Sequence, residues 1–596
     1  MSSDTASSGD PVMTSAGGAA STGTAPREAP RPSAERPPLR PLGERLEELA
    51  APAHYLSLVI GLAFLLYMAR HLWFVGDIFE FFNRFQPGQS LSLFFPHNEH
   101  WSTIPILLNL GLYKLVGLRS YVPYIALDLI AHLAVAHLLW RWMRRLDVDP
   151  WLATGLAAAF IVLGGGVENL TSSFQIGFVL PCVLGLLGAF LLDYSGPSRW
   201  DRDTGYWIFG VAAIMCSGIG VCAVLLGAAL ALLRRGWLAA LRAACVPAVV
   251  YLVWLALIGH KAISTTPAPK YDLPLVVQYV WTGLTSAIEG TTGWTGLGGA
   301  LALGLGVWLY LNRRLARGPL AFAFAGPPVA LIFFATIGVG RISLGVQEST
   351  FSHYAYEWVI LLLPVTAVAL TQLTRRSLTG RFVALALTAV VAVNGVAGIS
   401  TWLFTNNPIQ EGTEGQILAA AHLATGGAPL AVGDAAEVAP ANSPNLTLGD
   451  LRSMLAAGAI PLGTAITATD TLNASLYLQV SVTRTPLDTG PQPTIGNDVQ
   501  PAPESSGGSC YTVANGASPA VLRLVFTSAG SVEITPSGGG DIVVQLAPQG
   551  DPLDLTATNS FPVGAGQTVY LNVTAAGTAP LISLPPGVTT VCGVAG

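Results

Sequence analysis

The sequence predicts an α-helical polytopic membrane protein of about 11 transmembrane helices, followed by an extracytoplasmic α+β region that ends in a small β-sandwich. Three observations predict this architecture. Only 11% of the 596 residues are charged, against about 25% in soluble domains, and the mean hydropathy is +0.55. Apolar runs recur from about residue 53 to residue 402. After residue 402 the composition changes to Thr, Ser, Gly, Pro and Val.

The composition also excludes several classes of protein. Such a low charged fraction rules out an ordinary cytosolic protein, a disordered protein and a coiled coil. The net charge of −5 gives no indication of a nucleic-acid partner. Lysine occurs only at positions 114, 261 and 270, and Ala, Gly and Arg are abundant. This usage favours a GC-rich bacterial genome, and therefore a location in a bacterial plasma membrane.

The first 402 residues divide into a tail and a transmembrane domain. Residues 1–50 are rich in Ser, Gly, Ala, Pro and Arg, which predicts a disordered cytoplasmic tail. Residues 51–402 carry apolar runs near the roughly 20 residues that a spanning helix needs. Two runs on either side of Gly218 are too short to cross alone, and we interpret them as a broken pair. The predicted spans are 53–74, 121–140, 152–167, 172–192, 205–217, 219–233, 237–259, 297–312, 319–338, 354–373 and 381–402.

Arginine distribution sets the predicted orientation. Arginines gather in alternate loops, and the positive-inside rule then places the N-terminus inside and the C-terminal region outside. Two outward loops are large, 75–120 and 260–296. Each has an apolar stretch too short to span, Ile104–Val116 and Val276–Ile288, which predicts helices in the outer interface.

The region after residue 402 divides into three predicted parts. Residues 403–485 form an α/β segment with short helices at 413–424 and 448–457, residues 486–508 form a linker, and residues 509–596 form the β-sandwich domain. Its alternating runs are 520–526, 531–534, 542–546 and 568–573. Cys510 and Cys592 bracket the domain, and an oxidising exterior favours a disulfide between them; two unpaired thiols are the alternative.

The first outward loop holds the candidate catalytic residues. Asp77 and Glu80 follow the first span, and carboxylates at a membrane boundary are costly unless solvated, paired or functional. We expect Asp77 to be a catalytic carboxylate at the mouth of a cavity. The alternative is that both are interfacial anchors beside Arg84.

The same loop contains the run His97-Asn98-Glu99-His100. Its spacing differs from the HExxH zinc helix, which disfavours zinc. Glu99 is the second candidate catalytic carboxylate, and together with Asp77 it offers the oxygen ligands that Mg²⁺ or Mn²⁺ prefers. The alternative is a hydrogen-bonded loop that packs on the outer face.

Two further outward segments carry candidate binding residues. Glu168, Asn169 and Gln175 lie between the third and fourth spans, where the alternative is a helix N-cap at Thr171 or Ser172.

A second polar run precedes the tenth span. Arg341 with His353 and Tyr354 suits a phosphate, because the guanidinium is a planar, permanently charged fork. Lys261 and Lys270 in the second large loop would share that task. The alternative is solvation at the level of the headgroups.

These features resemble the GT-C superfamily of membrane glycosyltransferases over residues 60–402. The resemblance rests on the acidic first loop, the interfacial helices, the broken pair, the blocks 96–100 and 168–178, and the positions Arg341 and 352–354. It implies a polyprenyl-phosphate sugar donor, membrane lipids as partners, and an envelope glycan or glycoprotein acceptor. The resemblance implies binding residues in four segments of the chain. They would be Glu80, His97, Asn98, His100, Glu168, Asn169, Gln175, Lys261, Lys270, Arg341, His353 and Tyr354. This chain departs from the adjacent acidic pair common in that family, so Asp77 acts alone or with Glu80 or Glu99.

Two functions of different class follow. The first is inverting transfer of a sugar from its polyprenyl phosphate, with a carboxylate as base and Arg341 beside the departing phosphate. The second is a non-catalytic envelope protein or a lipid-linked glycan transporter. A transporter is expected to show matched broken helices in two repeats. The sequence shows one broken pair, so transfer ranks first.

Overall fold

The computed structural model describes residues 42–84, 92–262, 272–375, 377–487, 490–496, 502–516, 519–551 and 555–595. By its internal contacts the chain divides at residue 48, and the larger unit is Leu49–Gly596. Most of the predicted tail therefore lies outside the described residues. Helix α1 (Leu42–Met68) begins within the predicted tail, before residue 53, because Glu44, Arg45, Glu47 and Glu48 are helix-forming residues.

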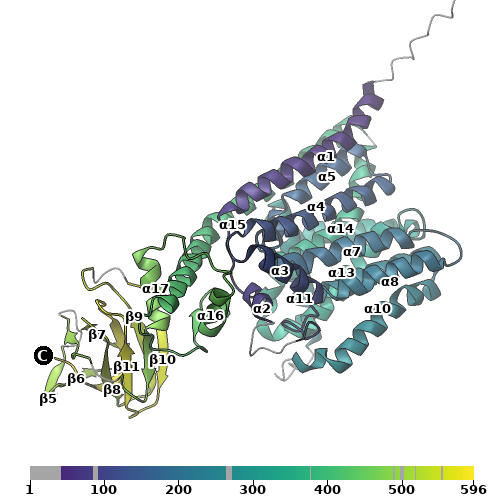
Figure 1. Cartoon of the computed structure of the whole chain (residues 1–596). Coiled ribbons are helices and arrows are strands. Elements are labelled where there is room, and N and C mark those ends of the chain that lie inside the picture. The colour runs from purple at the N-terminus through teal and green to yellow at the C-terminus, as the bar shows by residue number, and fades with distance from the viewer. Residues whose placement is uncertain are drawn as a thin grey trace, which may run out of the picture. The chain divides into compact units, whose positions relative to one another are not determined.

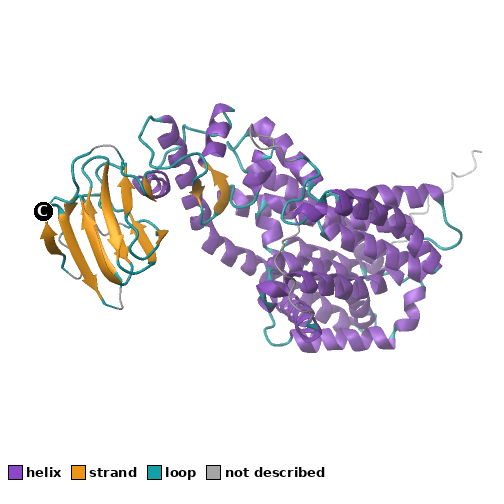
Figure 2. Ribbon diagram, turned by 90° about the horizontal axis from the view of Figure 1, so that it is seen from below, coloured by secondary structure: helices purple, strands orange, loops and turns teal. Residues whose placement is uncertain are grey.

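The region up to residue 425 is helical (Figures 1 and 2). After α1 its helices are α2 (Ile78–Asn83), α3 (Thr103–Val116), α4 (Val122–Arg145), α5 (Pro150–Ile161), α6 (Glu168–Thr171), α7 (Ile176–Leu192), α8 (Trp200–Ile214), α9 (Ile219–Arg235), α10 (Trp237–Leu257), α11 (Leu273–Thr292), α12 (Gly298–Leu311), α13 (Ala321–Arg341), α14 (Ser352–Thr374) and α15 (Leu378–Thr425).

Seven stretches of helix among the described residues are long and apolar enough to cross a membrane. They are Glu47–His71, Val122–Arg145, Ser173–Leu192, Trp237–Leu257, Ala321–Leu344, Ser352–Gln372 and Leu378–Thr425. The other four predicted spans coincide with the shorter helices α5, α8, α9 and α12. Helices also form at the two stretches predicted to be interfacial, as α3 and α11.

Helix α15 is longer than predicted. The span expected at 381–402 and the separate helix expected at 413–424 are one helix, although Pro408 lies inside it. The apolar half of α15 packs closely against the segment after α5. A Cβ atom added at Gly395 would lie 1.9 Å from the carbonyl oxygen of Val162. A Cβ atom added at Gly164 would lie 2.5 Å from the carbonyl oxygen of Gly395. Only glycine permits these backbones to approach so closely.

The loops that connect the helices form two separate groups. In one group, which we call the arginine cluster, Arg145 and Arg234 both pair with Asp193. In the other group Glu168 pairs with His353, and a Cβ at Gly218 would contact the His100 ring at 3.1 Å. The loops of each group are those that arginine distribution assigns to one side of the membrane.

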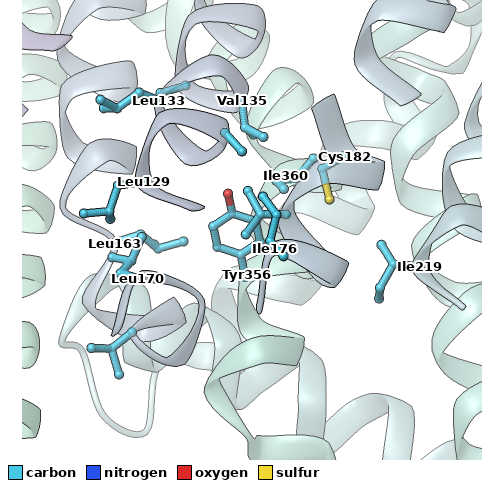
Figure 3. Packing of buried hydrophobic residues seen from close by; sticks show 14 of the residues in the cluster. Leu129, Leu133, Val135, Leu163, Leu170, Ile176, Cys182, Ile219, Tyr356 and Ile360 are labelled. Carbon is cyan, nitrogen blue, oxygen red and sulfur yellow. The ribbon is translucent and has the colours of Figure 1, made fainter. Parts of the chain in front are cut away.

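A large apolar core joins α4, α7, α13 and α14. Tyr356, Trp142 and Trp358 are among its largest buried side chains. Figure 3 shows Tyr356 among Leu129, Leu163, Ile176 and other side chains of this core. Trp142 lies between Phe190 and Phe322, with ring centroids 4.1 and 3.6 Å away.

The region after residue 425 combines two helices with antiparallel strands (Figure 1). The helices are α16 (Leu448–Ala456) and α17 (Ala468–Leu478), and β1 (Glu437–Ala439) pairs with β2 (Ser443–Thr447). A five-stranded sheet has the order β10 (Asn559–Val563), β9 (Gly540–Gln545), β12 (Leu581–Leu584), β7 (Ala520–Val525) and β4 (Thr494–Ile495). A six-stranded sheet has the order β3 (Val480–Thr483), β11 (Val569–Val573), β8 (Gly530–Pro536), β13 (Gly587–Cys592), β6 (Cys510–Asn515) and β5 (Glu504–Gly507).

The four predicted alternating runs are strands β7, β8, β9 and β11, and side chains of both sheets share one apolar core. The boundaries of the β-strand region differ from those expected for the linker and the β-sandwich domain. Strand β3 belongs to the six-stranded sheet although it precedes the predicted linker, and β4 and β5 lie inside that linker. Backbone pairing at a sheet edge does not require apolar side chains, so a Gly- and Ser-rich composition did not reveal these strands. Within the linker, residues 488–489 and 497–501 lie outside the described residues.

The predicted disulfide between Cys510 and Cys592 is confirmed. The two residues face each other in register on the neighbouring strands β6 and β13. The bond therefore fixes the last strand of the chain to the first strand after the linker.

Candidate functional site

Asp77 lies at the start of the short helix α2, directly after a buried aromatic segment. Phe74 is fully buried and packs edge-on against Tyr121 and Tyr124, with ring centroids 5.0 and 4.8 Å away. Gly76 then turns the chain with φ +71°, a conformation that favours glycine. The apolar packing therefore fixes where the Asp77 carboxylate projects.

His97 joins the two carboxylates of this loop. Its Nε2 lies 3.3 Å from Asp77 Oδ2, and its Nδ1 lies 2.7 Å from Glu80 Oε2. The His97 side chain is 1% exposed, whereas the side chain of Asp77 is 35% exposed. Because a carboxylate faces each ring nitrogen, the imidazole is suited to the protonated form, in which both ring nitrogens carry a proton.

Arg84 completes the row on the far side of Glu80. Its guanidinium is fully buried and donates to Glu80 Oε1 at 2.9 Å, to the carbonyl of Phe95 at 2.5 Å and to that of Ser92 at 3.3 Å. The buried cation is thus paired and hydrogen-bonded, as burial of a charge requires. We call Asp77, Glu80, Arg84, His97 and Asn98 the Asp77 cluster.

A tight turn presents His97 and Asn98 to Asp77. His97 and His100 exchange both backbone hydrogen bonds, at 2.9 and 2.8 Å. The two residues between them have positive φ, 44° for Asn98 and 70° for Glu99, as a type I′ turn requires. Asn98 Nδ2 donates to Asp77 Oδ2 at 2.8 Å, so the predicted hydrogen-bonded loop and the predicted site are the same feature.

Charge and hydrogen bonding keep Asp77, Glu80 and His97 in the Asp77 cluster ionised. Hydrogen bonding to His97 lowers the pKa of Asp77, against an opposing effect of burial. Burial raises the pKa of Glu80, but the bonds from His97 and Arg84 outweigh it and the net shift is downward. Burial lowers the pKa of His97, but its bonds to Asp77 and Glu80 outweigh it and the net shift is upward. Each group therefore favours its charged form.

Glu168 and His353 form a second pair. His353 Nδ1 lies 2.6 Å from Glu168 Oε2, and the Glu168 backbone N–H donates to Ser352 Oγ at 3.1 Å. Asn169 Nδ2 reaches the carbonyl of His353 at 3.4 Å. Burial raises the pKa of Glu168, but the hydrogen bonds from His353 outweigh it, and the net shift is downward. Glu168 and Asn169 thus tie the 168–178 block to the start of α14.

Aromatic side chains of that block bring the two groups together. The Phe174 ring centroid lies 5.3 Å from that of His97. The Phe178 centroid lies 6.1 Å from that of His100 and 5.7 Å from that of His353. The three histidines therefore border the same short aromatic segment.

His100 is in an electropositive environment. Burial lowers the pKa of His100 to about 4, and the positive charges of Arg341, His97 and His353 lower it further. Arg341, the last residue of α13, is half-buried and lies beside the hydroxyl of Tyr354. Within the described ranges it has no ion pair with a carboxylate. The surroundings of His100 are suited to an anion.

The other predicted site residues are not part of these two groups. Glu99 is exposed at the tip of the turn, and Lys261 is exposed in the 3₁₀ segment Gly259–Ala262. Gln175 adjoins Phe174, and its buried Oε1 lacks a hydrogen-bond partner among the residues described. Lys270 lies outside the described residues. No set of three or more His, Cys, Asp or Glu side chains in the described part of the chain is arranged to hold a metal ion.

Sequence reasoning missed one contact of Asp77. Asn445 in β2 donates from Nδ2 to Asp77 Oδ1 at 3.2 Å. No local pattern marks this residue, since it lies in a different region of the chain. Comparison with protein-family models, curated proteins and solved structures gives no match for the chain.

Proposed function

We propose that the protein is a membrane glycosyltransferase that moves a sugar from a polyprenyl-phosphate donor to a cell-envelope acceptor. One observation carries the proposal: the partly exposed carboxylate of Asp77 contacts His97, while the charge of Arg341, which has no carboxylate partner among the described residues, acts on His100 in the same turn. Inverting transfer needs an acceptor for a hydroxyl proton and a stabiliser for a departing phosphate.

Asp77 acts as the base in this proposal. It accepts a hydrogen bond from the acceptor hydroxyl, whose oxygen attacks the anomeric carbon of the donor. The bond from that carbon to the phosphate oxygen breaks, and the electron pair leaves with the phosphate. The hydroxyl becomes strongly acidic as the new bond forms, so a carboxylate with a lowered pKa takes the proton late in the step.

Arg341 receives the phosphate in this proposal. Its guanidinium is permanently charged, and its position beside the Tyr354 hydroxyl adds a hydrogen-bond donor. His353 is held by Glu168 and borders the same aromatic segment. Fixed donors aimed at the developing charge lower the barrier without reorganisation.

The proposal includes a hard divalent ion, for which Asp77 and Glu99 would supply carboxylate oxygens. Mg²⁺ commonly takes one or two protein carboxylates together with substrate phosphate oxygens, so two carboxylates suffice. Both side chains reach solvent, Asp77 at 35% exposure and Glu99 as an exposed residue. Mg²⁺ or Mn²⁺ held there would neutralise charge on the donor phosphate.

The full topology is also part of the proposal. We infer 11 spans, an inside N-terminus and an outside β-sandwich. The ion pairs of Asp193 with Arg145 and Arg234, and of Glu168 with His353, support this topology because each joins loops assigned to the same side. Thr527→Cys in a Cys245→Ser background tests the orientation, because Thr527 is exposed and Cys245 is the exposed free thiol among the described residues. An impermeant maleimide should label it in intact cells. Labelling only after permeabilisation reverses the orientation.

The activity itself is tested with purified protein and a panel of polyprenyl-phosphate sugars. Release of the polyprenyl phosphate together with a glycosylated acceptor supports transfer. Absence of transfer across the panel contradicts it.

A lipid-linked glycan transporter is the second candidate, and one observation favours it. Asp128 in α4 and Glu357 in α14 are buried within spanning helices, at 0% and 2% exposure. Neither Asp128 oxygen has a hydrogen-bond partner among the residues described. Ionisable residues inside a membrane often mark a transport path. Asp128→Asn and Glu357→Gln should abolish transport in reconstituted vesicles if this candidate is correct, and should leave transfer intact if it is not.

A further inference from the structure

The segment that contains strands β1 and β2 closes on the candidate site from outside the transmembrane helices. The backbone N–H of Gly76 donates to the carbonyl of Asn442 at 2.8 Å and to Ser443 Oγ at 3.2 Å. The next residue, Asp77, accepts from Asn445 at 3.2 Å. Three consecutive contacts therefore dock residues 442–445 onto the turn that presents the carboxylate.

This segment is itself held firmly. Asn442 Nδ2 donates to Thr413 Oγ1 at 2.9 Å, and Gln416 Nε2 donates to the carbonyl of Val438 at 2.8 Å, so α15 supports both strands. Leu446, the neighbour of Asn445, is fully buried. The amide of Asn445 is thus aimed by a fixed backbone, although the residue is exposed.

Helix α15 supports the first loop as well. The backbone N–H of Trp73 donates to Gln410 Oε1 at 2.9 Å, and both residues are buried. Gln410 and Thr413 lie one turn apart on the same helix. One rigid element therefore sets the distance between Asp77 and Asn445 from both sides.

The chemistry of the contacts to Asp77 is selective. Oδ2 is contacted by His97 and Asn98, whereas Oδ1 accepts a hydrogen bond from Asn445. An amide donor orients a carboxylate without adding a charge that would suppress its basicity. The oxygen that Asn445 holds is the one left with an unused lone pair for an acceptor hydroxyl.

We propose that Asn445 is a positioning residue for Asp77, and that the docked segment 437–447 completes the site of transfer. This inference rests on the proposed function. It assigns to the extracytoplasmic region a direct part in the reaction, through Oδ1 of the base.

Geometry is tested first, without any activity. The double variant Asp77→Cys/Asn445→Cys, in a Cys245→Ser background, should be joined in membranes by a short bifunctional thiol cross-linker, because the two native side chains are in contact. The pair Asp77→Cys/Asn473→Cys is the matched control and should not be joined. Failure of the first pair to cross-link overturns the docked arrangement.

Kinetics of the otherwise native chain test the role. Asn445→Ala should lower kcat about tenfold with little change in the KM for donor, since orientation and not binding is lost. Asn445→Asp places a like charge beside Asp77 and should move the acid limb of the pH profile to higher pH. Asn445→Gln keeps the donor and should recover part of the rate, and Asn473→Ala should match the wild type.

The outcomes separate this inference from the proposed function. Wild-type kcat and pH profile in both Asn445→Ala and Asn445→Asp overturn the positioning role and leave transfer intact. Absence of transfer by the wild type, together with a 77–445 cross-link in the double-cysteine variant, overturns the proposed function, and with it the role of Asn445 in transfer.

Discussion

The Asp77 cluster and the arginine cluster both contain acidic side chains at the ends of transmembrane helices. The two clusters differ in the exposure of the carboxylate and in its partners. In the arginine cluster, Asp193 is 2% exposed and accepts from Arg145 and from Arg234, whose Nε lies 2.7 Å from Oδ1. In the Asp77 cluster the carboxylate is 35% exposed and its partners are a histidine and two amides.

This difference distinguishes a structural ion pair from a candidate reactive group. Two arginines around a buried carboxylate leave it no access to a substrate and no role beyond holding loops together. A histidine and amides orient a carboxylate and leave it accessible to a substrate. The contrast also applies to a neighbouring pair: the largely buried Asp149 is held by Arg381, whereas Glu168 is held by His353.

The largest expected effect lies in the Asp77 cluster. Asp77→Asn keeps the size of the side chain and removes its basicity, so transfer should fall by about 10²–10⁴-fold, the usual contribution of a positioned base. The measurement is the initial rate of transfer with purified protein. Melting temperature should fall only modestly compared with the loss of rate, because the pairing with His97 is weakened at a side chain that is 35% exposed.

Asp201→Asn is the matched control for this variant. Asp201 is exposed and pairs with the exposed Arg199, so its rate should equal that of the wild type. Near-full activity of Asp77→Asn would remove Asp77 as the base and make Glu99 or Glu168 the better candidate.

The arginine cluster should respond in the opposite way. Asp193→Asn leaves Arg145 and Arg234 without their counter-charge, which should destabilise the fold by about 3 kcal/mol. Thermal unfolding in detergent measures the loss. The specific activity of the molecules that remain folded should be unchanged, and a large loss of activity without a loss of stability would contradict the structural role.

The helices and the Asp77 loop were predictable from sequence, whereas the pairing of Asp193 with two arginines was not predicted. Every predicted span overlaps a helix, although the helix at 152–167 ends at Ile161, because long apolar runs indicate helices directly. The Asp77 loop was identified because carboxylates are rare in such a chain. Helix α17 was missed, although the Thr467–Asp470 capping box, which repeats the Thr447–Asp450 box of α16, is a signal that marks its start.

The contacts that complete the site were beyond sequence reasoning. Asn445 reaches Asp77 only because α15 continues unbroken past Pro408 and carries the β1–β2 segment back to the first loop. Arg84 looks like an ordinary interfacial cation in the sequence, and its complete burial depends on three carbonyl groups that the loop folds around it. Long-range packing decides both, and one sequence does not encode it locally.

The two clusters should also differ in how their contribution to stability depends on pH. The pKa of His97 is raised, so the stability that its charge contributes is present at low pH and is lost as pH rises through the folded value. The pKa values of Asp77 and Glu80 are lowered, so their contribution is lost as pH falls through their folded values. The Asp77 cluster is therefore intact only between these two limits.

His97→Gln tests the alkaline limit. The wild-type melting temperature should fall as pH rises past that limit, and His97→Gln should show a flatter response in the same range. The arginine cluster has no histidine and adds no alkaline loss below the range where arginine deprotonates. Identical alkaline behaviour of wild type and variant would contradict the assignment to His97.

The smallest expected effect is that of Glu99→Gln, which tests the metal hypothesis at the tip of the turn. Glu99 is exposed and has positive φ, and the substitution keeps its size, so folding should be unaffected. If Glu99 shares a divalent ion with Asp77 and the donor phosphate, losing one carboxylate weakens but does not abolish the site. We expect about a tenfold higher Mg²⁺ or Mn²⁺ concentration for half-maximal transfer, with a near wild-type rate at saturation. Transfer is measured in a metal titration after chelation, with Glu504→Gln as an exposed control on β5. A titration curve identical to that of the wild type would exclude Glu99 as a ligand, and the Asp77 cluster would then differ from the arginine cluster by its histidine and amides alone.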